Sequence, residues 1–154
     1  MDVKVFGVVG AGQMGNGIAH VAAVAGYNVI MNDVNQSFVD RRMQTTEKNL
    51  ARAVSKGKMT EDEKAQILGR IKPSVNLSDF AAADFVVEAV PEIMDLKKAV
   101  LQTLDQTLAA GKVLASNTSS ISITKLASLT KRPEKFIGMH FMNPVPVMKL
   151  VEII

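Results

Sequence analysis

Short runs of apolar residues alternate along the chain with longer segments in which apolar residues recur every three or four positions. Continuous apolar runs are typical of strands buried on both faces, and the longer repeat is typical of amphipathic helices. Their alternation indicates an α/β fold with a doubly wound, mainly parallel sheet. The pattern predicts strands at 4–9, 27–32, 71–77, 83–90, 112–115, 135–140 and 147–154. It predicts a first helix that ends near residue 25 and further helices at 36–56, 60–68, 95–108 and 123–129.

The segment from residue 36 to residue 68 is longer and more polar than a simple connection between two strands requires. Gly57 is a plausible end of its first helix, and Thr60 to Glu63 fits a capping box that opens the second. The sequence therefore predicts a helical arm, inserted after the second strand, that projects from the sheet.

The first apolar run ends in a glycine-rich turn that leads directly into a helical pattern. Gly10, Gly12 and Gly15 form G-x-G-x-x-G, in which the glycines allow a tight turn, close approach of a pyrophosphate and packing of helix on strand. Asp33 follows the second strand, 23 residues after Gly10, where a carboxylate accepts hydrogen bonds from a ribose. This context indicates a Rossmann-type dinucleotide-binding domain. A glycine-rich turn beside an unrelated surface aspartate is the alternative.

Composition narrows the possible functions. The 154 residues suit a single domain, 1–154, and the absence of cysteine removes thiolate chemistry, disulfides and cysteine–zinc sites. A net charge of +3 without a basic run, and a single tyrosine without tryptophan, argue against nucleic-acid binding. No signal peptide is visible and no apolar run reaches about 18 residues, so we expect a soluble, cytoplasmic protein without a membrane partner. Two histidines leave little basis for a metal site.

Polar residues follow the fourth, fifth and sixth predicted strands. In a parallel sheet, ligands bind beyond the carboxyl ends of the strands, so these residues are candidates for a site. They are Glu92, Lys97, Asn117, Ser119, His140 and Asn143.

Each candidate also has a purely structural interpretation. Glu92 and Lys97 fit a solvated ion pair at the start of a helix, and Asn117–Ser120 fits a turn with a helix cap. His140 lies between apolar residues, where a histidine is more often a satisfied core residue. We interpret His20, on the first helix, as structural.

Glu152 stands inside the apolar run that ends the chain. A carboxylate in an apolar strand is costly unless it is paired. Pairing with His140 would remove that cost and produce an oriented base, although the sequence does not show that the two residues meet.

Four segments together resemble one enzyme family, the L-3-hydroxyacyl-CoA dehydrogenases. They are Gly10–Gly15, Ala115–Ser120, Gly138–Glu152 and, more weakly, Val86–Glu92. The resemblance extends from about Lys4 to the end of the chain and is strongest to the short bacterial members that act on 3-hydroxybutyryl-CoA. The segment from His140 to Glu152 is its most specific part.

The resemblance implies an NAD-dependent interconversion of (S)-3-hydroxyacyl-CoA and 3-oxoacyl-CoA. His140 would be the general base and Glu152 its orienting partner, while Ser119 and Asn143 would hydrogen-bond the substrate oxygen. Imidazole suits this task because its pKa lies near the operating pH, and a carboxylate on its other nitrogen stabilises the imidazolium. The nicotinamide would carry out the redox step.

The resemblance also implies the binding sites. In the family the helical arm contacts coenzyme A, which would place Lys56, and less surely Arg52, near its phosphates, with Ser119 also close to the substrate. The cofactor would be lined by Gly10, Gly12, Gln13, Met14, Gly15, Asp33, Glu92, Lys97, Asn117, Ser119 and Asn143.

Preference for NAD over NADP is argued from Asp33, whose carboxylate would repel a 2′-phosphate. Val34, the next residue, supplies no compensating cation. Arg41 and Arg42 leave NADP binding open as the alternative.

The family continues with a helical C-terminal domain that dimerises, closes over the acyl-CoA and supplies an active-site asparagine. That domain is absent from this chain, which we therefore expect to be the cofactor domain of a longer homodimeric enzyme, with little activity alone. Two rival functions remain, a dehydrogenase of a free β-hydroxyacid and a non-catalytic NAD-binding module.

Overall fold

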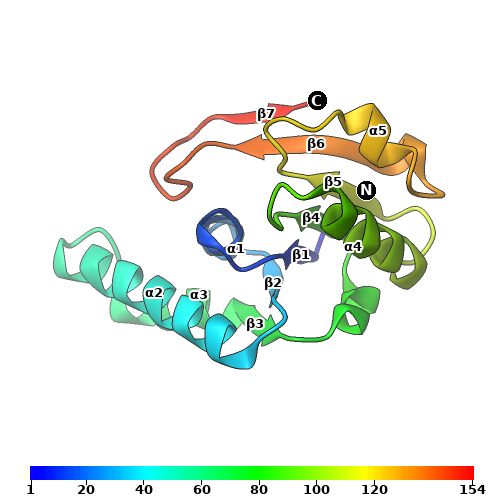
Figure 1. Cartoon of the computed structure of the whole chain (residues 1–154). Helices are drawn as coiled ribbons and strands as arrows, with labels where there is room; N and C mark the ends of the chain where they lie inside the picture. Colours follow the sequence, from blue (N-terminus) through cyan, green and yellow to red (C-terminus); the bar gives the residue numbers. More distant parts are fainter.

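The computed structural model describes residues 1–154 and contains one seven-stranded sheet in the order β3-β2-β1-β4-β5-β6-β7 (Figure 1). Strands β1 to β6 are parallel, and β7 runs antiparallel to β6. The first six follow the strand order of dinucleotide-binding domains, which confirms the predicted fold class. The strands are β1 (Val5–Val9), β2 (Asn28–Asn32), β3 (Ile71–Ser74), β4 (Phe85–Glu88), β5 (Val113–Ser116), β6 (Phe136–Phe141) and β7 (Val151–Ile153).

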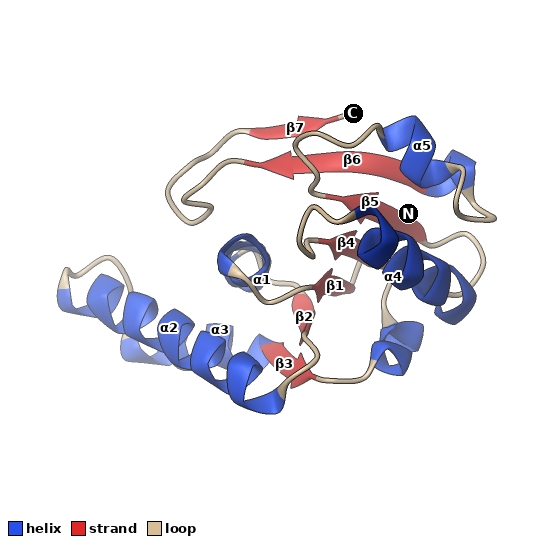
Figure 2. Ribbon diagram, in the orientation of Figure 1, coloured by secondary structure: helices blue, strands red, loops and turns tan.

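Helices cover both faces of the sheet (Figure 2). They are α1 (Gln13–Val24), α2 (Gln36–Ser55), α3 (Glu61–Arg70), α4 (Met94–Thr107) and α5 (Ile123–Ala127), with 3₁₀ turns η1 (Leu77–Ala82) and η2 (Pro133–Lys135). Neighbouring strand residues face opposite layers. Met31 packs in the layer with α1, and Ile30 packs in the layer with α4. Both faces are therefore buried, which explains why the strands read as continuous apolar runs rather than as alternating ones.

The predicted arm is the pair α2 and α3, which projects from the edge of the sheet (Figure 1). Its turn contains Gly57 at φ +70°, and α3 begins with the expected capping box between Thr60 and Glu63. The arm is also tied to the body of the domain, because buried Thr46 donates a hydrogen bond to Asn16 of α1 at 3.1 Å. No helix of the structure is both long and apolar enough to cross a membrane.

Three predicted strands are more than one residue shorter than expected. β3 ends at Ser74 because the chain turns into η1, and β4 covers only Phe85–Glu88. The largest correction concerns the predicted strand at 147–154, of which only Val151–Ile153 pairs. The backbone N–H groups of Val147 and Met148 instead donate to the carbonyl of Pro144 in a turn. The residues that precede β7 therefore belong to a loop.

Ionic contacts brace the amino-terminal end of the sheet, opposite the ends where β4 and β5 deliver the candidate residues. Asp84 accepts hydrogen bonds from the backbone of Lys4 and Val5 and from the ammonium of Lys112. The bond from Lys112, followed by the two backbone bonds, holds the pKa of Asp84 well below its usual range. This carboxylate joins the start of β1 to the start of β5.

Candidate functional site

Most of the candidate residues line a cleft of about 1130 Å³ at the carboxyl ends of the parallel strands. The cleft lies among the glycine turn, the ends of β2 and β4, and the segments that follow β5 and β6. Of the predicted cofactor residues, only Gly15 does not line it. His140 lines it as well, whereas Glu152, Arg52 and Lys56 do not.

The glycine turn has the geometry that its motif predicts. Gly10 has φ +91°, and a Cβ there would lie 2.7 Å from the carbonyl oxygen of Ala89. A Cβ on Gly15 would collide with the carbonyl of Gly10, whereas a Cβ on Gly12 would meet nothing within 4 Å. Gly12 is also the N-cap of α1 and provides no side-chain cap. The first N–H groups of α1 therefore have no intrahelical partner and are available to an anion.

Asp33 holds the glycine turn as well as facing the cleft. One carboxylate oxygen accepts a hydrogen bond from the backbone of Ala11 at 2.7 Å, and the other accepts one from Val34 at 2.7 Å. Arg41 lines the same cleft and Arg42 does not, while the guanidinium groups of both lie over the Phe38 ring, at 5.7 Å and 4.8 Å from its centre. A guanidinium thus lines the same cleft as Asp33.

His140 lies between two polar partners at the cleft. Its Nδ1 is 2.7 Å from Glu152 Oε2, and its Nε2 is 2.9 Å from Ser119 Oγ. The first contact follows from strand pairing, since His140 on β6 stands directly opposite Glu152 on β7. An ionised carboxylate can only accept, so Nδ1 carries the hydrogen, and in the neutral imidazole Nε2 is then the acceptor. The arrangement is that of an oriented imidazole base.

One expectation about Glu152 is wrong for this chain. Its apolar neighbours predicted a buried carboxylate, but its side chain is 49% exposed because β7 is the edge strand of the sheet. Glu152 thus pairs with His140 although its carboxylate is not buried.

Two asparagines join neighbouring segments around the cleft. Asn143 Oδ1 accepts a hydrogen bond from Gln13 Nε2 at 3.2 Å, which links the loop after β6 to the start of α1. Asn117 Oδ1 accepts one from the backbone of Phe141 at 2.8 Å. The side-chain oxygen of Asn117 therefore has a structural partner, and its amide nitrogen is the group left for a ligand.

The structural alternative for Glu92 and Lys97, a solvated ion pair, is not what the structure shows, because Lys97 is buried. Its side chain is only 1% exposed, and its ammonium lies 2.6 Å from Glu88 but 3.8 Å from Glu92. Glu92 is 43% exposed. It accepts hydrogen bonds from the hydroxyl of Thr118 at 2.8 Å and from the backbone of Ser119 at 3.0 Å.

Glu88 is the residue that our sequence reasoning missed. It is completely buried at the end of β4. Its signal was the same as that of Glu152, an acidic residue inside an apolar run, here Val86–Val90.

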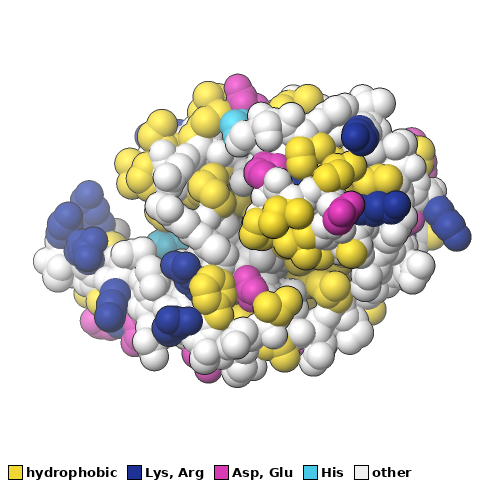
Figure 3. Space-filling model, in the orientation of Figure 1, with side chains coloured by type: hydrophobic (Ala, Val, Ile, Leu, Met, Phe, Trp, Pro, Cys, Tyr) yellow, Lys and Arg dark blue, Asp and Glu magenta, His cyan; other side chains and the backbone are white.

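The remaining candidates lie outside the cleft. Arg52 and Lys56 are exposed on the arm, where lysine and arginine side chains gather at the free end (Figure 3). His20 is buried on α1, and this burial lowers its pKa. No group of three or more histidine, cysteine, aspartate or glutamate side chains could hold a metal ion.

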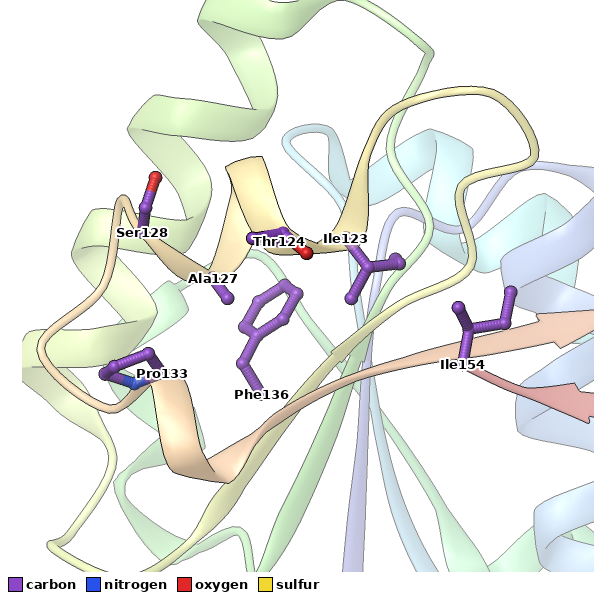
Figure 4. A pocket seen from close by; sticks show the side chains of 7 residues that line it. All are labelled: Ile123, Thr124, Ala127, Ser128, Pro133, Phe136 and Ile154. Carbon is purple, nitrogen blue, oxygen red and sulfur yellow. The ribbon is translucent and has the colours of Figure 1, made fainter.

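A second hollow, of about 510 Å³, lies beside α5 and β6 (Figure 4). No titratable side chain lines it, so it offers no acid–base chemistry. Its lining consists of Ile123, Thr124, Ala127, Ser128, Pro133, Phe136 and Ile154.

The residues of the large cleft fit a dinucleotide. Free N–H groups and the open position at Gly12 suit a diphosphate, and the Asp33 carboxylate suits ribose hydroxyls. The fold and the oriented histidine at the far side of the cleft define a dinucleotide-binding domain of the dehydrogenase type.

Comparison with known proteins gives the family. The model of the 3-hydroxyacyl-CoA dehydrogenase NAD-binding domain matches residues 5–154, and the chain belongs to this family.

Relatives agree with this assignment. The chain is 51% identical to the 3-hydroxybutyryl-CoA dehydrogenase of Bradyrhizobium diazoefficiens, over 99% of this chain and 52% of that protein. The crystal structure of (S)-3-hydroxybutyryl-CoA dehydrogenase from Ralstonia eutropha has a TM-score of 0.96 and 49% identity, and the match covers 99% of this chain and 54% of that one. The crystal structure of 3-hydroxybutyryl-CoA dehydrogenase from Escherichia coli has a TM-score of 0.97 and 40% identity, and the match covers 99% of this chain and 32% of that one. The chain thus spans about half the length of the first two.

Proposed function

We propose that the whole protein interconverts (S)-3-hydroxyacyl-CoA and 3-oxoacyl-CoA with NAD, most readily at the length of 3-hydroxybutyryl-CoA. Residues 1–154 would be its cofactor half. The observation that carries this proposal is the contact of His140 with Glu152 and Ser119 at the edge of the cleft behind the glycine turn. A module that only bound NAD would have no use for this arrangement.

His140 would accept the proton of the 3-hydroxyl group at Nε2. Glu152 would hold the ring in the required tautomer and stabilise the imidazolium that forms. Bound NAD would supply the redox chemistry, because its nicotinamide would accept a hydride from the carbon that bears this hydroxyl group. In the reverse direction His140 would return the proton.

Ser119 and Asn143 would position the reacting oxygen. The Ser119 hydroxyl already lies 2.9 Å from Nε2, so a substrate oxygen near Nε2 would also lie within its reach. Asn143 is held at the cleft by Gln13. Its amide nitrogen would donate to the same oxygen.

The remaining residues would bind the cofactor and the coenzyme. The first N–H groups of α1, including those of Gln13 and Met14, would bind the diphosphate, and Asp33 would bind the adenine ribose. Glu92, Asn117 and Ser119 line the same cleft and would contact the rest of the cofactor. We assign Lys56 and Arg52, on the arm, to the phosphates of coenzyme A.

We further propose that a helical C-terminal domain completes the enzyme, closes over the acyl-CoA and forms a homodimer. The shared length with the relatives, about half, supports this proposal. The enzyme would work in the cytoplasm on small acyl-CoA substrates.

The test of the proposed function is His140→Gln in the protein that carries both halves. We expect kcat with acetoacetyl-CoA to fall by about 10²- to 10⁴-fold, the usual contribution of a general base, while the affinity for NADH is retained. The matched control is His20→Gln, which changes the other histidine and lies outside the cleft. Unchanged turnover in His140→Gln would favour the binding module, and turnover of free 3-hydroxybutyrate but not of its CoA ester would favour the free-acid rival.

A further inference from the structure

A buried ion pair joins Lys97, which lines the cleft, to Glu88, a carboxylate with no assigned role. Glu88 and Lys97 are 0% and 1% exposed, and the Lys97 ammonium lies 2.6 Å from Glu88 Oε1. Glu88 does not line the cleft. It therefore has no direct route to a cofactor or a substrate.

Besides its ion pair with Lys97 of α4, the Glu88 carboxylate accepts hydrogen bonds from residues at the carboxyl ends of the sheet. Oε1 also accepts from the backbone of Val90 at 2.8 Å, and Oε2 accepts from the hydroxyl of Ser116 at 2.6 Å. Lys97 donates in addition to the carbonyl of Val90 at 3.1 Å. The carboxylate thus holds the residues that leave β4 and the last residue of β5 in one arrangement.

Two routes, each a series of polar contacts, lead from Glu88 to the segment Thr118–Ser119. In the first, Ser116 Oγ donates to Glu88 and accepts from the backbone of Thr118 at 3.2 Å. In the second, Lys97 lies 3.8 Å from Glu92. Glu92 then accepts from the hydroxyl of Thr118 and the backbone of Ser119. Both routes converge on Thr118–Ser119.

We propose that Glu88 is a positioning residue of the active site, acting through Ser116 and through Lys97 with Glu92 on the segment that carries Ser119. The inference rests on the proposed function, because Ser119 is the residue that meets His140 Nε2. Lys97 belongs to the same unit. Its ammonium is directed to Glu88 and Val90, so it acts on the site chiefly through its neighbours rather than as a free cation for the cofactor.

Stability alone does not account for such a pair. Apolar side chains of similar volume often replace a buried ion pair at no cost in stability. Apolar side chains, however, cannot fix the hydroxyl of Ser116 or the carboxylate of Glu92 in one direction. The ion pair therefore fixes the geometry of the loop at Ser119, which apolar side chains in its place would not do.

Two variants of this chain test the proposal. Ser116→Ala removes the hydroxyl of the first route and leaves the Glu88–Lys97 pair intact. The double variant Glu88→Gln/Lys97→Met removes both buried charges together, so that neither remains unpaired. If the double variant does not fold, Ser116→Ala alone decides.

We expect Ser116→Ala to shift the amide proton resonance of Ser119 and to weaken NADH binding about fivefold, the equivalent of one hydrogen bond. The double variant should weaken binding by about tenfold or more. The matched control is Asp105→Asn, which disturbs the other well-buried ion pair, with Arg132 at 2.6 Å, away from the cleft. It should lower the thermal midpoint and leave both the Ser119 resonance and the NADH affinity unchanged.

The proposal is overturned if the folded variants behave like Asp105→Asn, with lower stability but an unchanged Ser119 resonance and NADH affinity. Failure of the proposed function looks different, since the unaltered chain would then not bind NADH. The Ser119 resonance would in that case still decide whether Glu88 positions the loop.

Discussion

At the scale of single residues, acidic side chains in apolar runs point to the site more directly than the glycine motif does. Glu152 meets His140 across the β6–β7 pair, and Glu88 meets Lys97, which lines the cleft. The cost of an unpaired carboxylate in an apolar strand requires such partners. The sequence identified the first pair as a hypothesis because a histidine was within reach on a neighbouring predicted strand. The pair of Glu88 and Lys97 was missed because Lys97 lies on a helix. The helical repeat does not show which strand residue a side chain of that helix will contact.

His20 yields a prediction about pH at this scale. Burial lowers its pKa, so the unfolded chain, with a pKa near 6.5, takes up a proton before the folded chain does. Stability is therefore lost as the pH falls below about 6.5 towards the folded-state pKa. We expect His20→Gln to reduce this loss, measured as the free energy of urea unfolding between pH 8 and pH 5. An identical pH dependence in both proteins would show that His20 is not protected from protonation.

At the scale of elements, the first strand, the glycine turn, α1 and β2 were predictable because local rules govern them. The glycines, the helical repeat and Asp33 all belong to one continuous segment. The strand predicted at 147–154 failed for the opposite reason. Exposed apolar residues in a loop, such as Val147 and Met148, have the same pattern as a strand, and only the turn at Pro144 separates the two.

Packing between α1 and the loop after β6 was also invisible in the sequence. A Cβ on Gly17 would lie 2.7 Å from Cβ of Val145, so α1 accepts the loop only because residue 17 has no side chain. That loop carries Asn143. Gly17, just after the dinucleotide motif, therefore helps to position Asn143 of the proposed active site.

The corresponding prediction concerns Gly17→Ala. The new methyl group must displace the loop, and overpacking of this kind costs about 1–3 kcal/mol, which lowers the midpoint by several degrees for a chain of this size. In the protein with both halves, we expect kcat to fall more than the affinity for NADH, because Asn143 moves while Asp33 and Gly10 do not. Gly69→Ala, where a Cβ meets nothing within 4 Å, is the control. Equal behaviour of the two variants would contradict the packing argument.

At the scale of the whole molecule, the chain forms a six-stranded parallel dinucleotide unit with one antiparallel edge strand. The fold class, the helical arm and the position of the cleft could be predicted from the sequence, because the order of strands and helices follows a common pattern and that pattern places the ligand site. The contacts of Glu88 with Ser116 and of Glu92 with Thr118 could not, since each joins the segment at the end of β4 to the segment at the end of β5, which only the folded sheet brings together.

The central claim is a site for NAD in which Asp33 both binds the ribose and holds the glycine turn. The most direct measurement is a calorimetric titration of this chain with NADH and with NADPH, repeated on Asp33→Asn and Asp33→Ala. In Asp33→Asn the side-chain amide oxygen can still accept from the backbone of Ala11, but the side chain no longer repels a phosphate.

We expect the unaltered chain to bind NADH at least about tenfold more tightly than NADPH, a difference of about 1.4 kcal/mol. Asp33→Asn should narrow that preference, and Asp33→Ala should weaken NADH binding further because the turn loses its carboxylate contact. Binding of neither dinucleotide, or equal affinities that Asp33→Ala leaves unchanged, would contradict the account.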